Sequence, residues 1–503
     1  MTLMLSWTFA VFASNPTFAQ RADAQSDTVV VTATRFAEAS PRAPANISVI
    51  TRDDIRNTPN LSLPNVLQQS AGIEVRGLYG VLGIDSTIDM RGFGETAAPN
   101  TLILLDGQRL NPIDLGSINW SAVPLASVDR IEVIRGSGTV LYGDRATGGV
   151  INIVTDKSGG TRLSAEAGAG SYGYRGAEAY AAGGSAGLYF NLSGQYRESD
   201  GFRRNNQQDQ RALSGRLGYE LANGGELFAD FAGYADSNGL PGSLFRAQYD
   251  ADPSQARTPL DSQRRDGYRL RPGLALELTP ALRMEMELSA DHAELRTDSP
   301  SGSFIEDRDR DLTSFTPRLR WNHGLGALAS ETILGADIYQ GETEARSVSG
   351  FVGSNRQRAE QHSQALYVQN TTDLTSALAL TIGGRTQRVR QEASDDAAGL
   401  RGETTRTQHA GEIGLSWQAL RDMRLYARAG QVFRFASTDE LFGFDPVFFV
   451  PVFRGDLRPQ RGSNSELGAD WRIGSARILA TLYRLDLRDE IGFNATTLSL
   501  IHI

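Results

Sequence analysis

The sequence predicts an all-β transmembrane antiparallel barrel with an N-terminal α+β plug domain in its lumen. Residues 101–155 form a compact, turn-rich stretch, and after about residue 160 apolar and polar residues alternate in one segment after another to the end of the chain. In residues 282–291, every even-numbered residue is apolar and every odd-numbered residue is polar or charged. Because successive strand residues point to opposite faces, such segments are strands with one apolar and one polar face.

Strand length and connector length favour a membrane barrel over a soluble β-sandwich. The alternating segments run to about 10 or more residues, the length a tilted strand needs to cross a bilayer, whereas strands of globular sheets average about 5–6. Up-and-down barrels combine tight periplasmic turns with long outward loops. The connectors are expected to alternate in the same way between short ones (183–187, 222–225, 279–280, 372–376 and 473–475) and long polar ones (198–210, 236–265, 297–310, 343–358, 392–406 and 436–463).

Composition excludes several other classes of protein. No apolar run beyond the N-terminus approaches the ~20 residues of a spanning helix, so a helical membrane protein is excluded. The absence of cysteine removes disulfide and thiolate-metal frameworks, and a net charge of −9 without a basic tract disfavours nucleic acid as a partner. The five histidines are scattered without ligand spacing, and no serine lies in a nucleophile-elbow context. An enzyme is therefore not expected.

The N-terminus has features of an export signal. An apolar run covers residues 3–13, and Thr17 and Ala19 are small residues placed before a cut at Gln20. No lysine or arginine precedes Arg21, so the usual positively charged first region is missing. A signal peptide over residues 1–19 is the preferred interpretation, with a short buried segment as the alternative.

A strongly strand-forming segment follows the signal. Three consecutive valines are flanked by threonines, and β-branched residues favour extended backbone. The segment is either an ordinary edge strand or a strand that pairs with another protein through its backbone, and its position before the plug favours pairing. The residues expected to pair are Asp27, Thr28, Val29, Val30, Val31, Thr32, Ala33, Thr34 and Arg35.

Several motifs resemble, in the same order, those of the TonB-dependent outer-membrane receptors. Residues 27–35 resemble the TonB box of that family. Residues 63–75, 89–92, 104–107, 131–136 and 141–153 resemble its plug domain, and residues 430–441 and 455–459 resemble signature stretches of its barrel. The resemblance covers the chain from about residue 27 to residue 495. It divides the chain into a signal peptide (1–19), a periplasmic segment with the TonB box (20–36), a plug (37–157) and a partial barrel (158–503).

The resemblance implies active uptake across the outer membrane of a Gram-negative cell. A scarce nutrient too large for general porins binds at the extracellular face, and the TonB box becomes available in the periplasm. TonB, energised by the proton gradient through ExbB and ExbD, pairs with that strand and pulls on the plug of a receptor expected to be monomeric. The alternatives are a passive porin or adhesin, which needs no inserted domain of this size, and a secreted soluble β-protein.

Ligand capture is expected at the plug apices and in the outward loops. The aromatic residues of the 436–463 loop either pack into a small local core or contact a large, partly apolar ligand. Four arginines of earlier loops, Arg203, Arg204, Arg246 and Arg257, would suit an anionic chelate. Glu198, Asp200 and Asp209 could bind calcium through oxygen ligands, although such residues are more often solvated. The candidate ligand residues are Leu78, Tyr79, Phe93, Phe442, Phe444, Phe448, Phe449, Phe453 and Arg454.

The substrate is expected to be a ferric siderophore, with cobalamin as a close second. Residues 27–35 and the compact plug resemble those of cobalamin receptors. Haem is disfavoured because no histidine lies between Phe435 and Leu457, where haem receptors of this family usually have one.

The number of strands departs from the family pattern. The alternation predicts about fifteen strands, whereas plugged transporters of this type close with about 22. The sequence also lacks the terminal strand ending in an aromatic residue that such barrels carry. An incomplete set would leave unpaired edges, so we expect a fragment that forms an open, C-shaped sheet around the plug and does not transport by itself.

Overall fold

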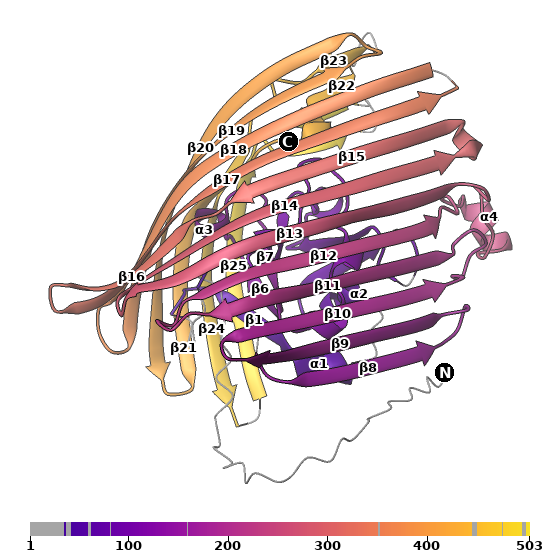
Figure 1. Ribbon diagram of the computed structural model, residues 1–503. Helices are drawn as coiled ribbons and strands as arrows, with labels where there is room; N and C mark the ends of the chain where they lie inside the picture. The colour runs from indigo at the N-terminus through magenta and orange to yellow at the C-terminus, as the bar shows by residue number, and fades with distance from the viewer. Residues whose placement is uncertain are drawn as a thin grey trace, which may run out of the picture.

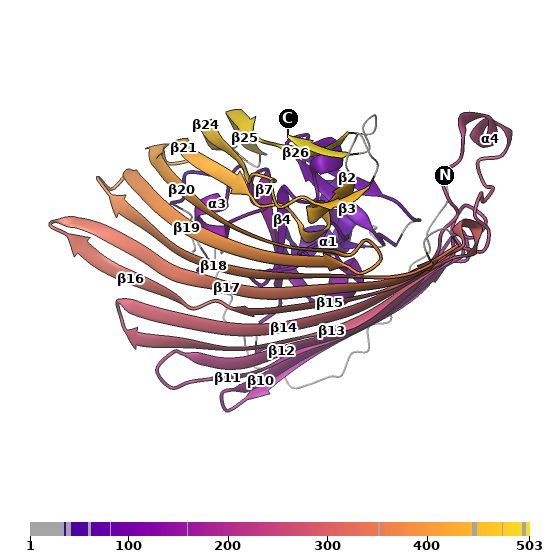
Figure 2. The same ribbon diagram turned by 90° about the horizontal axis from the view of Figure 1, so that it is seen from above.

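A computed structural model describes residues 35–36, 42–58, 62–80, 82–157, 159–350, 353–444, 450–474, 476–494 and 499–502. A strongly curved antiparallel sheet dominates the structure, and the N-terminal domain lies against its concave face (Figures 1 and 2). In this described part of the chain, no helix is long and apolar enough to cross a membrane.

The curved sheet is an up-and-down meander of long strands. Each strand pairs with its neighbours in sequence, and β8 and β25 stand at the two edges. The strands are β8 (Arg162–Ala169), β9 (Arg175–Ser185), β10 (Leu188–Ser199), β11 (Gln208–Glu220), β12 (Glu226–Gly239), β13 (Ser262–Thr279), β14 (Leu282–Ser299), β15 (Phe304–Phe315), β16 (Arg318–Leu325), β17 (Leu328–Ser349), β18 (Gly353–Asp373), β19 (Leu378–Asp395), β20 (Leu400–Leu420), β21 (Met423–Arg434), β24 (Gln460–Ile473) and β25 (Ala476–Arg488).

The expected number of about fifteen strands is confirmed for the described residues. β15 and β16 both pair with β14 and β17, so they occupy one position in the sheet. Thr316 and Pro317 separate them, and proline cannot donate to a strand ladder. The sheet therefore has fifteen strand positions and is open rather than closed between β8 and β25.

The prediction of a long loop is wrong for three of the connectors. Residues 297–310, 343–358 and 392–406 lie mostly within strands that continue outward and turn tightly, as at 396–399 between β19 and β20. Most residues of these extensions are polar or small on both faces of the strands, so the sequence loses its alternation. Loops remain at 200–207, where β10 ends, and at 240–261, which contains α4 (Arg246–Ala251). The connection after β21 is described at 435–444 and 450–459.

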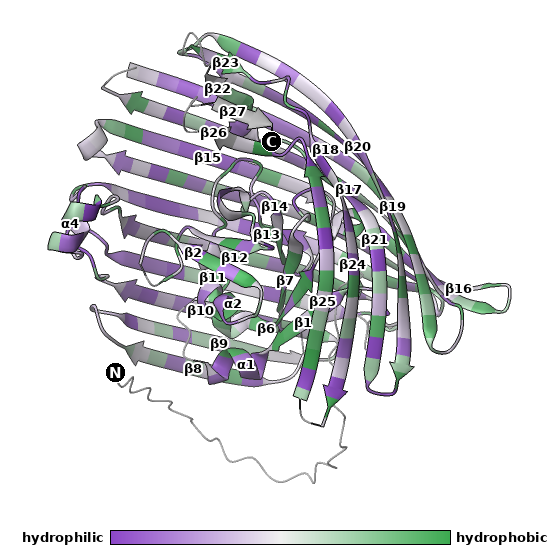
Figure 3. Ribbon diagram, turned by 180° about the vertical axis from the view of Figure 1, so that it is seen from behind, coloured by the Kyte–Doolittle hydropathy of each residue, from purple (hydrophilic) through white to green (hydrophobic). Residues whose placement is uncertain are grey.

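Hydrophobic and hydrophilic residues alternate along many strands of the curved sheet (Figure 3), and apolar side chains such as Leu192, Leu217 and Leu288 are exposed. Trp321, Trp417 and Trp471 are each about half exposed. Each is paired with the first residue after a short turn: Leu282, Leu378 and Met423, respectively. The three indole rings therefore lie at one level near the short-turn end, as in the aromatic girdles of membrane barrels.

The N-terminal domain is a small α+β unit. Its main sheet has the order β1-β6-β7-β4-β5, in which β4 and β7 are parallel, and β2 and β3 form a separate pair. Thr51 and Asp54 form a capping box that starts α1. The elements are β1 (Asn46–Thr51), α1 (Arg52–Asn57), α2 (Leu63–Gln68), β2 (Ile73–Gly77), β3 (Ser86–Met90), η1 (Gly94–Thr96), β4 (Thr101–Leu105), β5 (Gln108–Arg109), η2 (Trp120–Ala122), η3 (Leu125–Ser127), β6 (Val128–Arg135), α3 (Thr139–Tyr142) and β7 (Gly149–Thr155).

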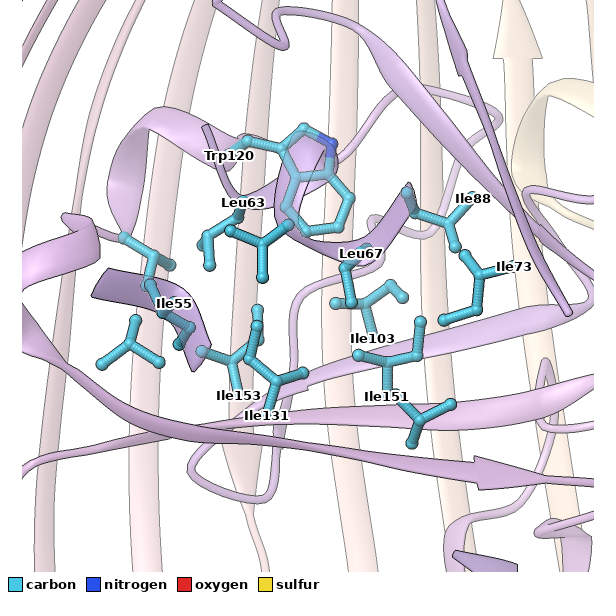
Figure 4. Close-up of a cluster of buried hydrophobic side chains, with 14 of the residues drawn as sticks. Ile55, Leu63, Leu67, Ile73, Ile88, Ile103, Trp120, Ile131, Ile151 and Ile153 are labelled. Carbon is cyan, nitrogen blue, oxygen red and sulfur yellow. The ribbon is translucent and has the colours of Figure 1, made fainter. Parts of the chain in front are cut away.

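The plug has an apolar core of its own. Leu67, Ile131 and Ile151 are fully buried between α2 and the sheet (Figure 4). Trp120 closes the cluster, and its indole nitrogen donates to the carbonyl of Ser86 at 3.0 Å. The remaining short elements lie near the outward end or late in the chain: η4 (Pro300–Gly302), η5 (Thr438–Leu441), β22 (Phe442–Phe444), β23 (Pro451–Phe453), β26 (Ile491–Asn494) and β27 (Ser499–His502).

Candidate functional site

The predicted partner-binding segment ends in a clamp on the barrel wall. Of the nine predicted residues only Arg35 is described, and Asp27–Thr34 lie outside the described residues. Arg35 donates through Nη1 and Nη2 to the two carboxylate oxygens of Asp337, at 2.8 and 2.9 Å. Asp337 projects inward from β17, 302 positions away in sequence. A bidentate pair of this kind is the strongest form of arginine–carboxylate contact.

Three further groups complete this clamp. Arg385 on β19 donates to the same Asp337 at 2.8 Å, so one carboxylate holds two guanidinium groups. The guanidinium of Arg35 lies over the rings of Tyr367, at 4.5 Å, and of Tyr142 in the plug, at 5.0 Å. Burial alone would lower the pKa of Arg35, but Asp337 and its hydrogen bonds raise that pKa above the ordinary value. Arg35 is therefore firmly charged where it meets the wall.

Phe36 anchors the next position. Its ring is buried in a cluster that includes Tyr142 from the plug and Ile333 and Tyr367 from the wall. A cavity of about 200 Å³ lies beside it, lined by plug groups such as Asp106 and Lys157 and by charged wall residues of β11 to β16. The segment that enters the plug thus passes a polar, incompletely filled space.

Much of the remaining plug–wall contact is made of polar and charged pairs, although Val140 of α3 packs in an apolar cluster with Val389 and Phe433 of the wall. Arg91 pairs with Glu466 on β24 at 2.5 Å, and Asp106 pairs with Arg271 on β13 at 3.2 Å. Arg145 donates to the hydroxyl of Ser437 at 2.9 Å. These three contacts join charged plug residues to charged or polar groups of the wall. Asp129, Arg130 and Arg135 pair within the plug. Arg109 pairs with Asp144 of the plug, and its guanidinium lies 5.3 Å from the centre of the Tyr339 ring on β17.

Buried carboxylates of the plug remain ionised because arginines surround them. Burial would raise the pKa of Asp144, but Arg109 and Arg145 hold that pKa at about 2. Asp144 also accepts from Gln387 on β19 at 3.0 Å, which connects this charge to the wall. Asp106 has its pKa lowered in the same way by Lys157 and Arg271, against the effect of burial.

The predicted apex residues differ in exposure. Leu78 is 66% exposed to solvent, whereas Phe93 is half-buried, and Asp89 holds its backbone amide at 3.0 Å. The carbonyl of Tyr79 accepts from Gln208, at the start of β11, at 2.7 Å. Leu78 is therefore the candidate of this group that a ligand could reach directly.

The sequence left open whether the aromatic residues of the 436–463 loop pack locally or contact a ligand, and the described ones pack locally. Phe442 and Phe453 pack with Leu441 and Leu457 against small wall residues, including Ala359 and Ala393. Arg454 donates to Asp456 at 3.0 Å. Local packing therefore accounts for these positions. Phe448 and Phe449 lie outside the described residues, and Phe444 is described only through its backbone pairing with Pro451.

The calcium candidates do not form a cluster. Glu198 accepts from the hydroxyl of Tyr196 at 2.6 Å, and Asp209 pairs with Arg211 at 3.0 Å. Within the described ranges, no group of three or more histidine or acidic residues is placed to hold a metal ion.

Sequence reasoning missed the wall half of the clamp. Asp337, Tyr367 and Arg385 carry no local motif, and strand alternation only places them among many inward-facing residues. Which inward-facing residues contact Arg35 depends on how the plug is placed against the wall. A contact between residues 302 positions apart gives no signal in one sequence.

Comparison with known proteins agrees with this architecture. Residues 146–500 match the family model "TonB dependent receptor-like, beta-barrel", and residues 41–150 match "TonB-dependent Receptor Plug Domain". A curved membrane sheet with an inserted plug and a wall-held N-terminal segment defines a class of plugged outer-membrane barrels. The chain belongs to the TonB-dependent receptor family, whose members are outer-membrane β-barrel receptors.

The relatives in sequence and the neighbours in structure are named for different cargoes. The vitamin B12 transporter BtuB of Vibrio vulnificus (strain CMCP6) is 35% identical over 231 residues, 45% of this chain and 35% of the relative. BtuB of Vibrio cholerae serotype O1 (strain M66-2) is 38% identical over 149 residues, 29% of this chain and 24% of that protein. The matches thus span only about a quarter to a third of these curated relatives.

Solved structures with the same fold are less similar in sequence. The unliganded ferric citrate transporter FecA has a TM-score of 0.80 at 18% identity, covering 91% of this chain and 73% of FecA. The alcaligin receptor FauA of Bordetella pertussis has a TM-score of 0.74 at 16% identity, covering 94% of this chain and 77% of FauA. At these identities the likeness establishes the fold.

Proposed function

We propose that the protein is an active uptake receptor, which binds a scarce, large nutrient at the outward face and passes it to the periplasm using energy delivered by TonB. The observation that carries the proposal is the clamp of Arg35 on Asp337. A strand that a periplasmic partner grips at residues 27–34 transmits tension first to this pair. ExbB and ExbD, which couple TonB to the proton gradient, are the further partners this scheme needs.

The clamp is arranged so that it can open. Removing one member of a buried ion pair usually leaves an uncompensated charge and costs about 3–5 kcal/mol. When Arg35 leaves, however, Asp337 keeps Arg385 as its partner at 2.8 Å. The wall carboxylate is therefore never unpaired, and the cost of release falls mainly on Arg35, which gains water and a partner strand. Arg35 and Phe36 line the cavity, so displacement of residues 35–36 enlarges it.

For the substrate we propose vitamin B12 or a related corrinoid ahead of a ferric siderophore. The sequence relatives at 35–38% identity carry vitamin B12 transport in their names, whereas the siderophore receptors are similar mainly in fold. This reverses the order expected from the sequence alone.

Uptake of labelled vitamin B12 by cells that express the complete receptor tests the proposal. We expect uptake to fall to background when TonB is deleted or when the proton gradient is dissipated, while binding to the cells persists. Uptake that continues without the gradient would instead indicate the passive porin, and binding without any uptake would indicate the adhesin.

A further inference from the structure

A polar cavity of about 430 Å³ lies at the short-turn end of the sheet, between the wall and the start of the plug. The turns after β20 and β24 reach this same end of the sheet (Figure 1). Tight turns of outer-membrane barrels face the periplasm, so the cavity lies on the periplasmic side. Eight charged residues line it, and together they are called the arginine basin: Arg42, Arg421, Arg424, Arg472, Arg477, Asp373, Asp422 and Asp470.

The strand residues of the arginine basin point into the lumen. Trp417 and Trp471 belong to the outward-facing indole level, and successive strand residues point to opposite faces. Their neighbours Ser416, Asp470 and Arg472 line the cavity and therefore point inward. The wall separates these side chains from lipid, so an occupant reaches them from the periplasmic solution.

Positive charge exceeds negative charge in the arginine basin. It holds five arginines and three aspartates, a net charge of +2 (5 − 3). Arg42 pairs with Asp373 at 3.0 Å, and Arg477 donates to both carboxylate oxygens of Asp470, at 2.9 and 2.8 Å. Two of the three carboxylates are therefore already engaged by one arginine each.

Two arginines of the basin are left without a counter-ion. Among the described residues, the guanidinium groups of Arg421 and Arg472 form no hydrogen bond and no salt bridge. Arg472 is also directly opposite Arg477 across β24 and β25, and like charges in that position destabilise a sheet. An anion between these two guanidinium groups would turn an unfavourable arrangement into a favourable one.

Arg424 fixes the arginine basin against the plug. Its Nη1 and Nη2 donate to the carbonyls of Ala43 and Ala45, at 2.6 and 3.0 Å, and its side chain is only 12% exposed. Arg42 precedes these two residues, so guanidinium groups from plug and wall line one space. Groups that are held in place before a ligand arrives lower the entropic cost of binding it.

We propose that the arginine basin binds a soluble phosphate monoester from the periplasm. Guanidinium groups bind phosphate through paired hydrogen bonds, and a phosphate monoester carries about −1.5 to −2 charges at neutral pH, which complements the basin. Small-molecule sites have volumes of about 300–1,000 Å³, so a cavity of about 430 Å³ accommodates an organic group besides the phosphate. This site is separate from cargo capture at the outward face.

Calorimetric titration of the purified receptor in an uncharged detergent tests the inference, without TonB and without cargo. The probes are glycerol 3-phosphate, its uncharged counterpart glycerol, and the dicarboxylate succinate, all at neutral pH. We expect glycerol 3-phosphate to bind at least about 10-fold more tightly than succinate, and glycerol not to bind. The affinity for glycerol 3-phosphate should fall by about 3-fold or more from low to high NaCl, because salt screens the arginines.

A double variant and a matched control locate the binding. Arg421→Gln with Arg472→Gln removes the two guanidinium groups without a counter-ion and should weaken binding of glycerol 3-phosphate by about 10-fold or more. Arg484→Gln is the control, because Arg484 lies on β25 but on the face opposite to Arg477, where it pairs with Asp486 at 2.8 Å. Its affinity should stay within about 2-fold of the wild type.

A third variant should bind more tightly, which a folding defect cannot produce. Asp470→Asn removes the carboxylate that competes with the ligand for Arg477, so the affinity for glycerol 3-phosphate should rise by about 3-fold or more. Binding of glycerol, tighter binding of succinate, binding of no probe, or equal losses in the double variant and in Arg484→Gln would each overturn the inference. Binding of phosphatidylglycerol in micelles but not of glycerol 3-phosphate would also overturn it, since the ligand would then be a lipid.

Discussion

The plug has an apolar core, whereas its contact with the barrel wall consists largely of polar and charged pairs. Inside the plug, Leu67, Ile131 and Ile151 pack in a dry apolar cluster around Trp120. Toward the wall, many contacts are ion pairs such as Arg91–Glu466 and Asp106–Arg271, and Asp106 also lines the cavity of about 200 Å³. Polar pairs can be exchanged for water at small net cost, whereas exposing an apolar core cannot. The plug can therefore shift against the wall without losing its own fold.

Proline substitutions in the segment that is proposed to pair with TonB should give the largest functional effect. Val31→Pro, or Val30→Pro, removes a backbone donor and stiffens the strand that TonB is proposed to pair with. We expect uptake to fall by about 100-fold or more, to background, with ligand affinity unchanged. Uptake is measured in intact cells, and ligand affinity is measured with the purified receptor. Full uptake by either proline variant would contradict the proposed coupling.

Truncating a side chain in the apolar core of the plug should give the largest effect on stability. Ile151→Ala empties a fully buried site, and truncations of this kind cost about 2–5 kcal/mol. Leu78→Ala is the matched control on an exposed plug residue and should change stability by less than about 0.5 kcal/mol. Urea titration followed by protease susceptibility of the plug measures both. Equal losses in the two variants would mean that the cluster around Trp120 does not hold the plug together.

Weakening the clamp between Arg35 and Asp337 should have a smaller effect, which is on the affinity for TonB. Asp337→Asn leaves two buried guanidinium groups, Arg35 and Arg385, without their shared charge. Asparagine still accepts a hydrogen bond, so we expect a shift of about 1.4 kcal/mol, or about tenfold, toward the released segment. The affinity of the cargo-free receptor for the periplasmic domain of TonB should rise by that factor.

The control for the clamp lies on the same strand. Glu342 faces outward from β17 and pairs with Arg358 at 2.8 Å, half exposed. Glu342→Gln should leave TonB affinity unchanged, because surface ion pairs contribute about 0–1 kcal/mol. If both variants raise the affinity equally, the effect belongs to the strand and not to the clamp.

The sequence predicts the architecture better than the contacts. Alternation identifies the strands because only one face meets lipid, and it fails over 343–358 and 392–406, where most residues on both faces of the strands are polar or small. The docking of Phe453 against Gly402 and the nearby alanines depends on small wall residues of separate strands. The Arg35–Asp337 pair depends on a register between plug and wall that no local pattern encodes.

Acidification should give the smallest effect on stability, because it neutralises a single carboxylate, Asp144, that joins plug and wall. The pKa of Asp144 is about 2 in the folded plug, below the ordinary 3.8, because Arg109 and Arg145 outweigh burial. A lowered carboxyl pKa stabilises the fold above the unfolded value and loses that contribution as pH falls from about 4 to about 2. The difference of nearly two pKa units corresponds to about 2 kcal/mol.

Comparison with Asp144→Asn isolates this contribution. The wild-type plug should be more stable than the variant at pH 6, by about 2 kcal/mol, and the gap should close as pH approaches 2. Asp129→Asn changes a more exposed plug carboxylate and should show a gap several-fold smaller. Urea titration at each pH gives both gaps. A gap for Asp144→Asn that stays constant down to pH 2 would show that its contacts with Arg109 and Gln387 act through shape alone, and that this part of the plug–wall contact is not electrostatic.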